Sequence, residues 1–240
     1  MKPKRVVAVV PAKLTSVRLP QKNLAPIEGQ ALFAYSIRAA LKSTLIDEVV
    51  VSSESGSLLA TAGALGARTV LRPESLSGSK VTNQTVLAHV LDELEQQGAG
   101  CPEVIVLLQP THPFRVPADI DAAIALLGEH SGFSSIFALR ADPRLFGHLD
   151  AQRFVPDVPL PRQRDRERTR YENTGAFYIL DVAKTVQAGS FFGDRIGGFA
   201  LSRPELEIDI DEPIDLKIAR AMARYYRHDL ESLGLLDRTE

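Results

Sequence analysis

The chain has 240 residues, with 28 basic and 30 acidic side chains and a formal net charge of −2. This balance excludes a nucleic-acid or membrane protein that depends on a global basic field, and the length allows one domain with a sizeable core. Cys101 is the sole cysteine, which excludes a disulfide framework and argues against a zinc site. The apolar run near the N-terminus is too short for a signal peptide or a membrane span, so we expect a cytoplasmic protein.

The first predicted element is a strand at residues 6–10, where five consecutive apolar residues indicate burial on both faces of a sheet. Pro11 ends this strand and a polar loop follows. The loop carries two hydroxyl groups, three cations and an asparagine: Thr15, Ser16, Lys13, Arg18, Lys22 and Asn23. Open α/β sheets bind ligands at the carboxyl ends of their strands, and these cations suit phosphate oxygens. The alternative is a solvated basic loop.

Helix-like and strand-like segments then alternate along the chain. Their spacing predicts helices at residues 32–42, 57–63, 83–97 and 118–127 and strands at residues 48–53, 68–71, 103–108 and 134–139. Alternation of this kind is typical of a parallel sheet built from right-handed crossovers. The predicted fold class is therefore α/β, with a mainly parallel, twisted sheet flanked by helices.

Two of these strands end in polar residues at the expected ligand edge. Arg72 follows the strand at 68–71, and from the residues alone it is interpreted as a surface cation that closes the strand. Thr82 or Asn83 is expected to cap the next helix. Gln109 follows the strand at 103–108 and either contacts the ligand or caps a turn.

The composition changes between residues 140 and 172. Prolines and glycines are frequent there, and arginines at positions 162, 164, 166, 168 and 170 alternate with polar and acidic residues. The stretch is too irregular for another strand–helix unit, and its charge pattern alone is that of a solvated arm. We expect a single domain over residues 1–240, with residues 140–172 as an arm.

An acidic pair near the C-terminus is the second chemical feature. Asp209 and Asp211 lie two residues apart on an apparent strand, so both carboxylates are expected on one face. Such a pair repels unless a cation lies between, and Mg²⁺ favours one or two protein carboxylates completed by substrate phosphates. Alternatively, Asp211 caps a helix that begins near Pro213, and Asp209 is merely exposed. The last dozen residues are polar and are expected to fray.

The loop after the first strand also carries a family resemblance. P-A-K-L-T-S-V-R-L-P-Q-K-N resembles the signature loop of the sugar-acid cytidylyltransferases, which make CMP-activated sialic acids and CMP-KDO. The matching positions are Pro11, Ala12, Ser16, Leu19, Pro20, Lys22 and Asn23. Lys13 stands where the family usually has Arg, and Val17 where the sialic-acid branch usually has Lys. Arg18 resembles the KDO branch, so the loop does not choose between the branches.

Further motifs follow in the family's order. L-L-Q-P-T-H-P-F-R at residues 107–115 resembles the L-L-Q-P-T-S-P-L-R of acylneuraminate cytidylyltransferases, with His112 in place of Ser, and favours the sialic-acid branch. L-R-P-E-S-L at 71–76 and D-I-D-E-P-I-D-L at 209–216 resemble the family's base-reading and metal motifs. N-T-G-A-F-Y-I at 173–179 resembles N-G-A-I-Y-I, with an inserted Thr.

The resemblance implies a Rossmann-like nucleotidyltransferase that uses CTP and Mg²⁺ to make a CMP-sugar acid. The implied nucleotide-binding residues are Pro11, Ala12, Lys13, Ser16, Arg18, Lys22, Asn23, Arg72 and Thr82, with Arg72 reading the cytosine. The implied sugar-acid residues are Gln109, Arg170 and Asn173, and the implied metal ligands are Asp209 and Asp211. Lys13, Lys22 and Asp211 are the implied catalytic residues. The arm, including residues 161–163, is expected to pack against a second subunit, so the resemblance implies a homodimer.

Departures from the family pattern at Lys13, Val17, Ser79 and Glu172 keep two alternatives open. One is an enzyme of the CMP-KDO synthetase type, and the other is a non-catalytic nucleotide-binding homologue. Glu172 stands near the position where an Arg often binds the sugar carboxylate, and Arg170 is the neighbouring candidate to supply that charge.

Overall fold

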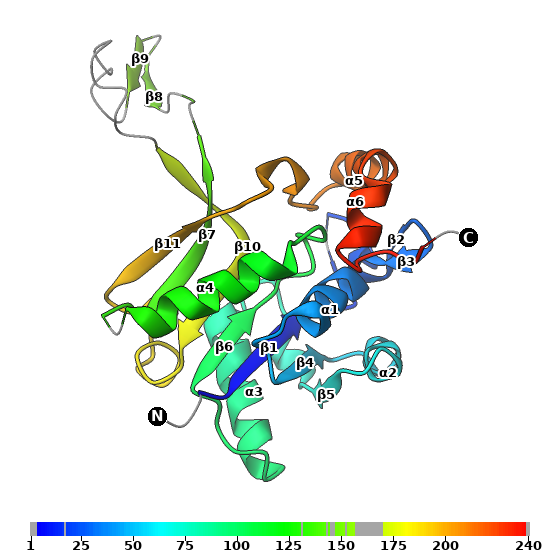
Figure 1. The fold of residues 1–240 in the computed structure, drawn as a ribbon, viewed down its shortest axis with the longest axis vertical. Helices are drawn as coiled ribbons and strands as arrows, with labels where there is room; N and C mark the ends of the chain where they lie inside the picture. The colour runs from blue at the N-terminus through cyan, green and yellow to red at the C-terminus, as the bar shows by residue number, and fades with distance from the viewer. Residues whose placement is uncertain are drawn as a thin grey trace.

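A seven-stranded sheet forms the centre of the protein, in the order β11-β7-β10-β6-β1-β4-β5 (Figure 1). The structure is a computed structural model and describes residues 4–16, 18–130, 132–142, 144, 147–151, 153–156 and 170–238. The strands are β1 (Val6–Pro11), β4 (Glu48–Ser53), β5 (Arg68–Leu71), β6 (Val104–Leu107), β7 (Ser135–Ala141), β10 (Tyr171–Asp181) and β11 (Ile196–Ala200). β10 runs antiparallel to β6 and β7, and the other pairings are parallel.

Helices cover both faces of this sheet, which confirms the predicted fold class. They are α1 (Leu32–Lys42), α2 (Gly56–Ala64), α3 (Asn83–Gln96), α4 (Pro117–Glu129), α5 (Pro213–Tyr225) and α6 (Arg227–Ser232), with short 3-10 turns η1 (Lys22–Leu24), η2 (Glu74–Leu76) and η3 (Pro204–Leu206). No helix in the described part of the chain is long and apolar enough to cross a membrane.

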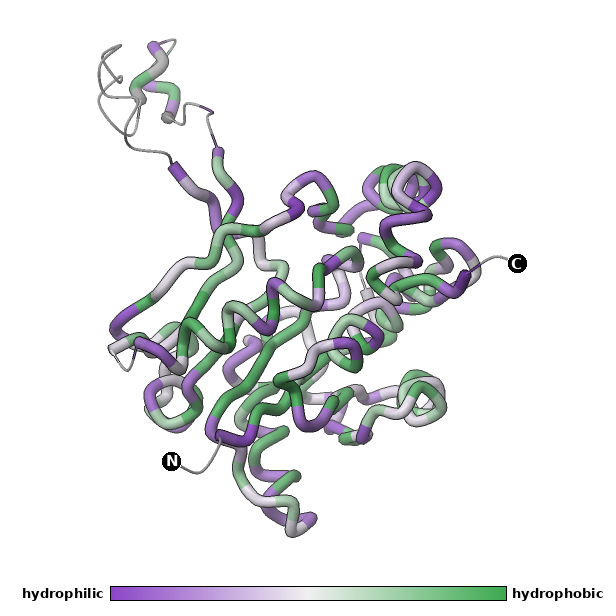
Figure 2. Tube along the Cα trace, in the orientation of Figure 1, coloured by the Kyte–Doolittle hydropathy of each residue, from purple (hydrophilic) through white to green (hydrophobic). Residues whose placement is uncertain are grey.

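The alternation of side chains along β1 divides the interior into two cores. Val7 and Val9 pack in the core of α3, whereas Ala8 and Val10 pack in the core that contains residues of α1 and α4. Figure 2 shows that the central strands are mostly hydrophobic, whereas hydrophilic and hydrophobic residues are mixed along helices such as α5 and α6. β1 is therefore buried on both faces, as its apolar run predicts.

Two small hairpins lie outside the main sheet. β2 (Pro26–Ile27) and β3 (Gln30–Ala31) form the first. β8 (Gly147–Asp150) pairs with β9 (Arg153–Pro156) in the second, which stands away from the sheet in the predicted arm (Figure 1). The arginines at 162, 164, 166 and 168 and the predicted dimer segment at 161–163 lie outside the described residues.

A bulge interrupts β10 where the sequence carries its inserted threonine. The pairing register against β7 shifts between Asn173 and Tyr178. The Thr174 hydroxyl donates to the Ala138 carbonyl oxygen at 3.3 Å and accepts from the Ala176 N–H at 3.2 Å. The threonine thus supplies hydrogen bonds that the disrupted ladder loses.

The C-terminal segment is packed, so the prediction of a frayed end is wrong for the described residues. Leu230, Leu235 and Leu236 belong to the same buried core as α1. Asp237 forms an ion pair with Arg38 at 2.7 Å. The polar composition of this segment hides three leucines that helix α6 and the turn after it place on one buried face.

Candidate active site

A cleft lies where the loops after β1, β5 and β6 meet, at the carboxyl ends of these parallel strands. Its volume is about 380 Å³, within the size range of small-ligand sites. The predicted site residues that line it are Pro11, Lys13, Ser16, Arg18, Lys22, Asn23, Arg72, Gln109 and Asp211. Because four of these side chains are cations, the cleft is suited to a polyanionic ligand.

Asp211 lies against two cations of the signature loop. Its carboxylate is 2.6 Å from Arg18 Nη2 and 3.0 Å from Lys22 Nζ. Lys22 also donates to the carbonyl oxygen of Ile210 at 2.9 Å. Burial alone would raise the pKa of Asp211, but hydrogen bonds and charge attraction from Lys22 and Arg18 outweigh burial and lower it. The carboxylate is therefore ionised at neutral pH and joins the acidic segment to the signature loop.

The segment that carries Asp209 and Asp211 is not part of a sheet, so the predicted strand is wrong. The N–H of Ile210 donates to the Thr111 carbonyl oxygen at 2.9 Å, which fixes the segment beside the loop after β6. Ile210 is fully buried and Ile208 packs on the same core. The alternation that suggested a strand reflects these two isoleucines facing inward between acidic residues.

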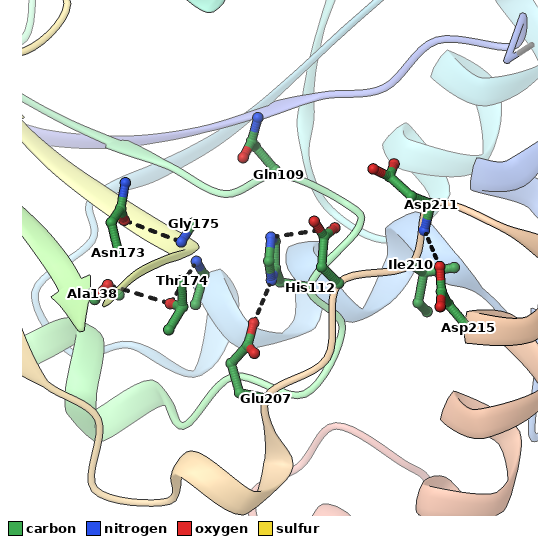
Figure 3. A network of polar contacts seen from close by, with 12 residues as sticks. Gln109, His112, Ala138, Asn173, Thr174, Gly175, Glu207, Ile210, Asp211 and Asp215 are labelled. Carbon is green, nitrogen blue, oxygen red and sulfur yellow. Dashed lines mark hydrogen bonds and ion pairs between the residues drawn. The ribbon is translucent and has the colours of Figure 1, made fainter. Parts of the chain in front are cut away.

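The N-cap residue of α5 is Glu212 rather than Asp211, and Glu212 forms a capping box with Asp215. The Asp215 carboxylate accepts the N–H of Asp211 at 3.0 Å (Figure 3) and the N–H of Glu212 at 2.8 Å. This is the acidic half of a capping box, a common device at helix starts. The side chain of Asp211 is consequently left to line the cleft, and the capping alternative for Asp211 does not hold.

The signature loop is shaped by hydrogen bonds to neighbouring backbone. The Ala12 N–H donates to the Ser52 carbonyl oxygen at 3.0 Å, and Asn23 Nδ2 donates to the Lys13 carbonyl oxygen at 2.7 Å. Ala12 is fully buried and does not line the cleft, whereas Asn23 is buried and does. These two residues hold the loop so that its cations face the cleft.

Arg72 is buried in the cleft wall and is surrounded by acceptors. Its Nε donates to Ser77 Oγ at 2.9 Å, its Nη1 to the Ser52 carbonyl oxygen at 3.3 Å, and its Nη2 lies 3.3 Å from the Glu54 carboxylate. Burial lowers the pKa of Arg72, and the charge of Glu54 opposes that effect. The alternative of an exposed surface cation is therefore wrong, because Arg72 is only 4% exposed.

Thr82 caps helix α3, as predicted. Its hydroxyl oxygen accepts the N–H of Thr85 at 3.2 Å. Thr82 does not line the cleft, although the flanking Val81 and Asn83 do. A contact between Thr82 and a base stays a prediction.

Arg115 holds Gln109 in place and has no role in the sequence prediction. Its guanidinium donates to the carbonyl oxygens of Gln109 and Ala176 and, at 2.9 Å, to the Ser36 hydroxyl. Burial lowers the pKa of Arg115, and the charge of Glu207 opposes this. Arg115 is the last residue of the 107–115 motif. The motif therefore included this residue but did not predict its hydrogen bonds.

The β10 bulge brings Gly175 against the loop after β6. Gly175 has φ of +80°, and a Cβ there would lie 3.1 Å from His112 Nε2 and 3.6 Å from Gln109 Oε1, so glycine is required. Asn173 lies beside it, and its Oδ1 accepts the Gly175 N–H at 3.2 Å (Figure 3). Its Nδ2 donates to the Tyr178 hydroxyl at 3.1 Å. Asn173 thus stabilises the bulge and does not line the cleft.

His112 is buried between two acidic side chains. Its Nδ1 lies 2.7 Å from Glu207 Oε1, and its Nε2 lies 3.5 Å from Asp209 Oδ1. Glu207 is also paired with Arg140 at 3.2 Å. The sequence prediction noted His112 only as a departure from the motif and missed Glu207, because residues 95 positions apart meet here only through the fold.

The remaining predicted residues do not line the cleft. Glu172 sits directly opposite Arg140 across the β7–β10 pair and forms an ion pair with it. The Arg170 carbonyl oxygen accepts the N–H of Asp142 at 2.9 Å, and Arg170 does not line the cleft. Asp209 has a half-exposed side chain and also does not line it.

The carboxylates of Asp209 and Asp211 could supply some of the ligands of Mg²⁺, but not a complete coordination shell. Among the described residues, no group of three His, Cys, Asp or Glu side chains comes together as a metal site. Asp211 lines the cleft and Asp209 lies two residues away, against His112. Mg²⁺ needs only one or two carboxylates when substrate phosphates and waters complete its shell, so the oxygen donors present are compatible with it.

Comparison with known proteins defines the class. Residues 7–140 match the family model described as cytidylyltransferase. The chain belongs to this family, which confirms both the resemblance and the prediction of a nucleotidyltransferase. It is 32% identical over 219 residues to the CMP-N,N'-diacetyllegionaminic acid synthase of Legionella pneumophila, a match that covers 88% of this chain and 93% of that protein.

Two further relatives are more distant. The N-acylneuraminate cytidylyltransferase of Escherichia coli is 27% identical, over 90% of this chain and 51% of that protein, so this chain spans about half its length. The pseudaminic acid cytidylyltransferase of Campylobacter jejuni is 26% identical, over 89% of this chain and 94% of that protein.

Solved structures confirm the fold. A CMP-2-keto-3-deoxy-manno-octonic acid synthetase complexed with CTP matches with a TM-score of 0.67 at 19% identity, over 92% of this chain and 99% of that one. A 4-diphosphocytidyl-2C-methyl-D-erythritol synthase matches with a TM-score of 0.64 at 11% identity, over 91% and 99%. At such identities the likeness establishes the nucleotidyltransferase fold alone.

Proposed function

We propose that this protein joins CTP to the anomeric hydroxyl of a nonulosonic, sialic-acid-like sugar acid, giving a CMP-sugar acid and pyrophosphate. The observation that carries the proposal is the cleft that Lys13, Arg18 and Lys22 line, in which Arg18 and Lys22 are paired with Asp211. The names of the three relatives, which refer to legionaminic, N-acylneuraminic and pseudaminic acids, support this class of acid.

The loop cations would bind the triphosphate. Of the two cations paired with Asp211, Lys22 is the more buried: its side chain is 13% exposed, whereas that of Arg18 is 59% exposed. The exposed Arg18 can exchange its carboxylate partner for a phosphate oxygen with little change in packing. Lys13 and Ser16 line the same wall and would complete the contacts.

The chemistry needs no covalent protein intermediate. The anomeric hydroxyl oxygen attacks the α-phosphorus in line, the bond from phosphorus to the bridging oxygen breaks, pyrophosphate leaves, and the hydroxyl proton passes to solvent. Lys13 and Lys22 offset the charge that builds on the phosphate oxygens, so catalysis is positioning and charge stabilisation. Bound Mg²⁺, with Asp211 and Asp209 as its protein ligands, would supply Lewis-acid chemistry and orient the phosphates.

Gln109 is the proposed contact to the sugar acid or the ribose. It lines the cleft, Arg115 binds its backbone carbonyl oxygen, and the Gly175 bulge lies close to its side-chain oxygen. Asn173 and Arg170 lie farther toward the arm, and a contact between either residue and the acid is proposed only with the arm in place.

A homodimer is proposed on separate grounds. The β8–β9 hairpin carries Leu149, which is 72% exposed, and Tyr171 at the base of the arm is 51% exposed. We propose that these two side chains pack against a second copy of the chain. Light scattering should give twice the chain mass; a monomer at micromolar concentration would contradict the proposed homodimer.

Because CTP is a cytoplasmic nucleotide, we also propose a cytoplasmic location.

The test is pyrophosphate release with CTP and Mg²⁺ across N-acetylneuraminic, legionaminic, pseudaminic, KDN and KDO acids. Turnover with a nine-carbon acid is the expected result. Turnover with KDO alone would show that the protein is an enzyme of the CMP-KDO synthetase type. Binding of CTP without turnover on any of the five would support a non-catalytic homologue instead.

A further inference from the structure

We propose that Glu54 is a positioning residue that holds Arg72 in the orientation needed to select cytosine over uracil. This inference rests on the proposed function, since it assumes that a cytidine nucleotide occupies the cleft beside Arg72. Glu54 directly follows β4 and matches no motif that the sequence analysis singled out.

Glu54 joins three separate segments through its two carboxylate oxygens. Oε1 accepts the N–H of Leu14 in the signature loop at 2.7 Å. Oε2 accepts the Ser77 hydroxyl at 3.0 Å and lies 3.3 Å from Arg72 Nη2. The phosphate-facing loop and the base-facing arginine are therefore tied to one side chain.

The orientation of Arg72 depends on this arrangement. The side chains of Arg72 and Glu54 are only 3% and 11% exposed, so water offers the guanidinium little alternative support. Burial raises the pKa of Glu54, but hydrogen bonds from the backbone, Leu14 and Ser77 and the charge of Arg72 lower it overall, which keeps the carboxylate charged. Glu54 also compensates the buried charge of Arg72.

An arginine held in this way distinguishes the two pyrimidines by simple chemistry. Guanidinium groups only donate hydrogen bonds. Cytosine presents O2 and N3 as adjacent acceptors, whereas N3 of uracil carries a hydrogen and cannot accept. The acceptors on Ser77, Ser52 and Glu54 each take one N–H, from Nε, Nη1 and Nη2 of Arg72 respectively, so one N–H on Nη1 and one on Nη2 remain for a base. A donor pair in a fixed direction penalises uracil, because a free arginine could turn to reach O2 or O4 instead.

The chain supplies a matched control on the same strand. Glu48 lies at the opposite end of β4 and is also bound by two arginines, Arg5 at 2.7 Å and Arg68. Its side chain is 23% exposed and it does not line the cleft. A Glu48→Gln substitution therefore breaks a comparable ion pair without touching the proposed nucleotide site.

The experiment is calorimetric titration of the full chain with CTP and with UTP, in Mg²⁺ and without any sugar acid. Glu54→Gln keeps an acceptor for Leu14 but removes the charge facing Arg72. We expect the Kd for CTP to rise about tenfold and the CTP-over-UTP preference to fall by a similar factor. Glu48→Gln should lower the melting temperature and leave both Kd values unchanged.

Three results would overturn the inference, and they are distinguishable from one another. If the wild type binds no CTP, the proposed function fails and the inference fails with it. If the wild type prefers CTP and folded Glu54→Gln keeps the same preference, the inference alone fails. If Glu54→Gln does not fold, Ser77→Ala removes the hydroxyl between Glu54 and Arg72. It should reduce the preference about threefold, and an unchanged preference in that variant would reject the positioning role.

Discussion

The two sides of the cleft are built differently. On the nucleotide side, the cations come from one short loop after β1, and Arg72 comes from the end of β5. On the opposite side, His112 meets Glu207 and Arg115 meets Ala176, contacts that span 95 and 61 residues of the chain. These four residues do not line the cleft themselves, but His112 and Arg115 both donate to the backbone carbonyl oxygen of Gln109, which does. Both sides depart from the family's motifs, at Lys13, Val17 and Ser79 on the nucleotide side and at His112, Thr174 and Glu172 on the opposite side.

This difference has a physical basis. Phosphates are recognised by charge, which a loop at a strand end presents with few supporting contacts. The opposite side depends on a bulged antiparallel strand and on buried side chains that support one another. One insertion in β10 can reshape that side and leave the loop after β1 unchanged. The predictions below test this separation.

The largest expected effect is from Asp211, which links both sides. Asp211→Ala removes the carboxylate that binds Arg18 and Lys22, so turnover should fall by about a thousandfold with CTP and any accepted acid. Circular dichroism should show an intact fold. Asp209→Ala is the matched variant, and an equal loss there would indicate that the two carboxylates act together. Near-normal turnover in Asp211→Ala would refute the metal assignment.

Arg115 tests whether the second side depends on its buried supports. Arg115→Met leaves the Gln109 and Ala176 carbonyl oxygens without their donor, so the free energy of unfolding should fall by about 3 kcal/mol. Urea denaturation measures this free energy, and its value for Arg115→Lys should lie between those of the wild type and Arg115→Met. The KM for the acid should rise more than the KM for CTP; an equal rise in both would show that the sides are not separable.

His112→Ser restores the family residue and should act mainly on the acid. Loss of the imidazole removes the 2.7 Å partner of Glu207 and should cost about 1–2 kcal/mol of stability. The KM for the acid should change severalfold, while the Kd for CTP, measured by calorimetry, stays constant. A change in CTP affinity alone would contradict the proposed division of the cleft.

The smallest expected effect is on acid stability. The pKa of Asp211 is lowered by folding from its ordinary value of 3.8, so its contribution to stability is present above about pH 4 and is lost as the pH falls further. Asp211→Asn should be less stable than wild type at pH 6 and should lose less stability on acidification. Urea midpoints measured between pH 6 and pH 3 test this. Parallel curves for the two proteins would show that the ion pairs with Arg18 and Lys22 do not stabilise the fold.

Much of the nucleotide side could be predicted from the sequence, because its residues lie within short segments at strand ends. Lys13, Arg18 and Lys22 face the cleft since β1 is buried and its loop must emerge at the carboxyl edge. The prediction of a strand at Asp209 and Asp211 is wrong. Alternation of apolar and polar residues also arises when an irregular segment buries every second side chain. The prediction of a frayed C-terminus is wrong because it relies on the average polarity of the segment, which contains three buried leucines.

By itself, the sequence determined the α/β fold, the family, and the loop of cations at the head of the sheet, because local periodicity and strand-end chemistry act over short distances. Tertiary structure alone decided which carboxylate lines the cleft, which residue caps α5, and which side chains support Arg72 and Gln109. Those choices depend on contacts between segments far apart in the chain. Glu54 illustrates this: its position after a strand predicts nothing specific until folding brings Leu14, Arg72 and Ser77 around its carboxylate.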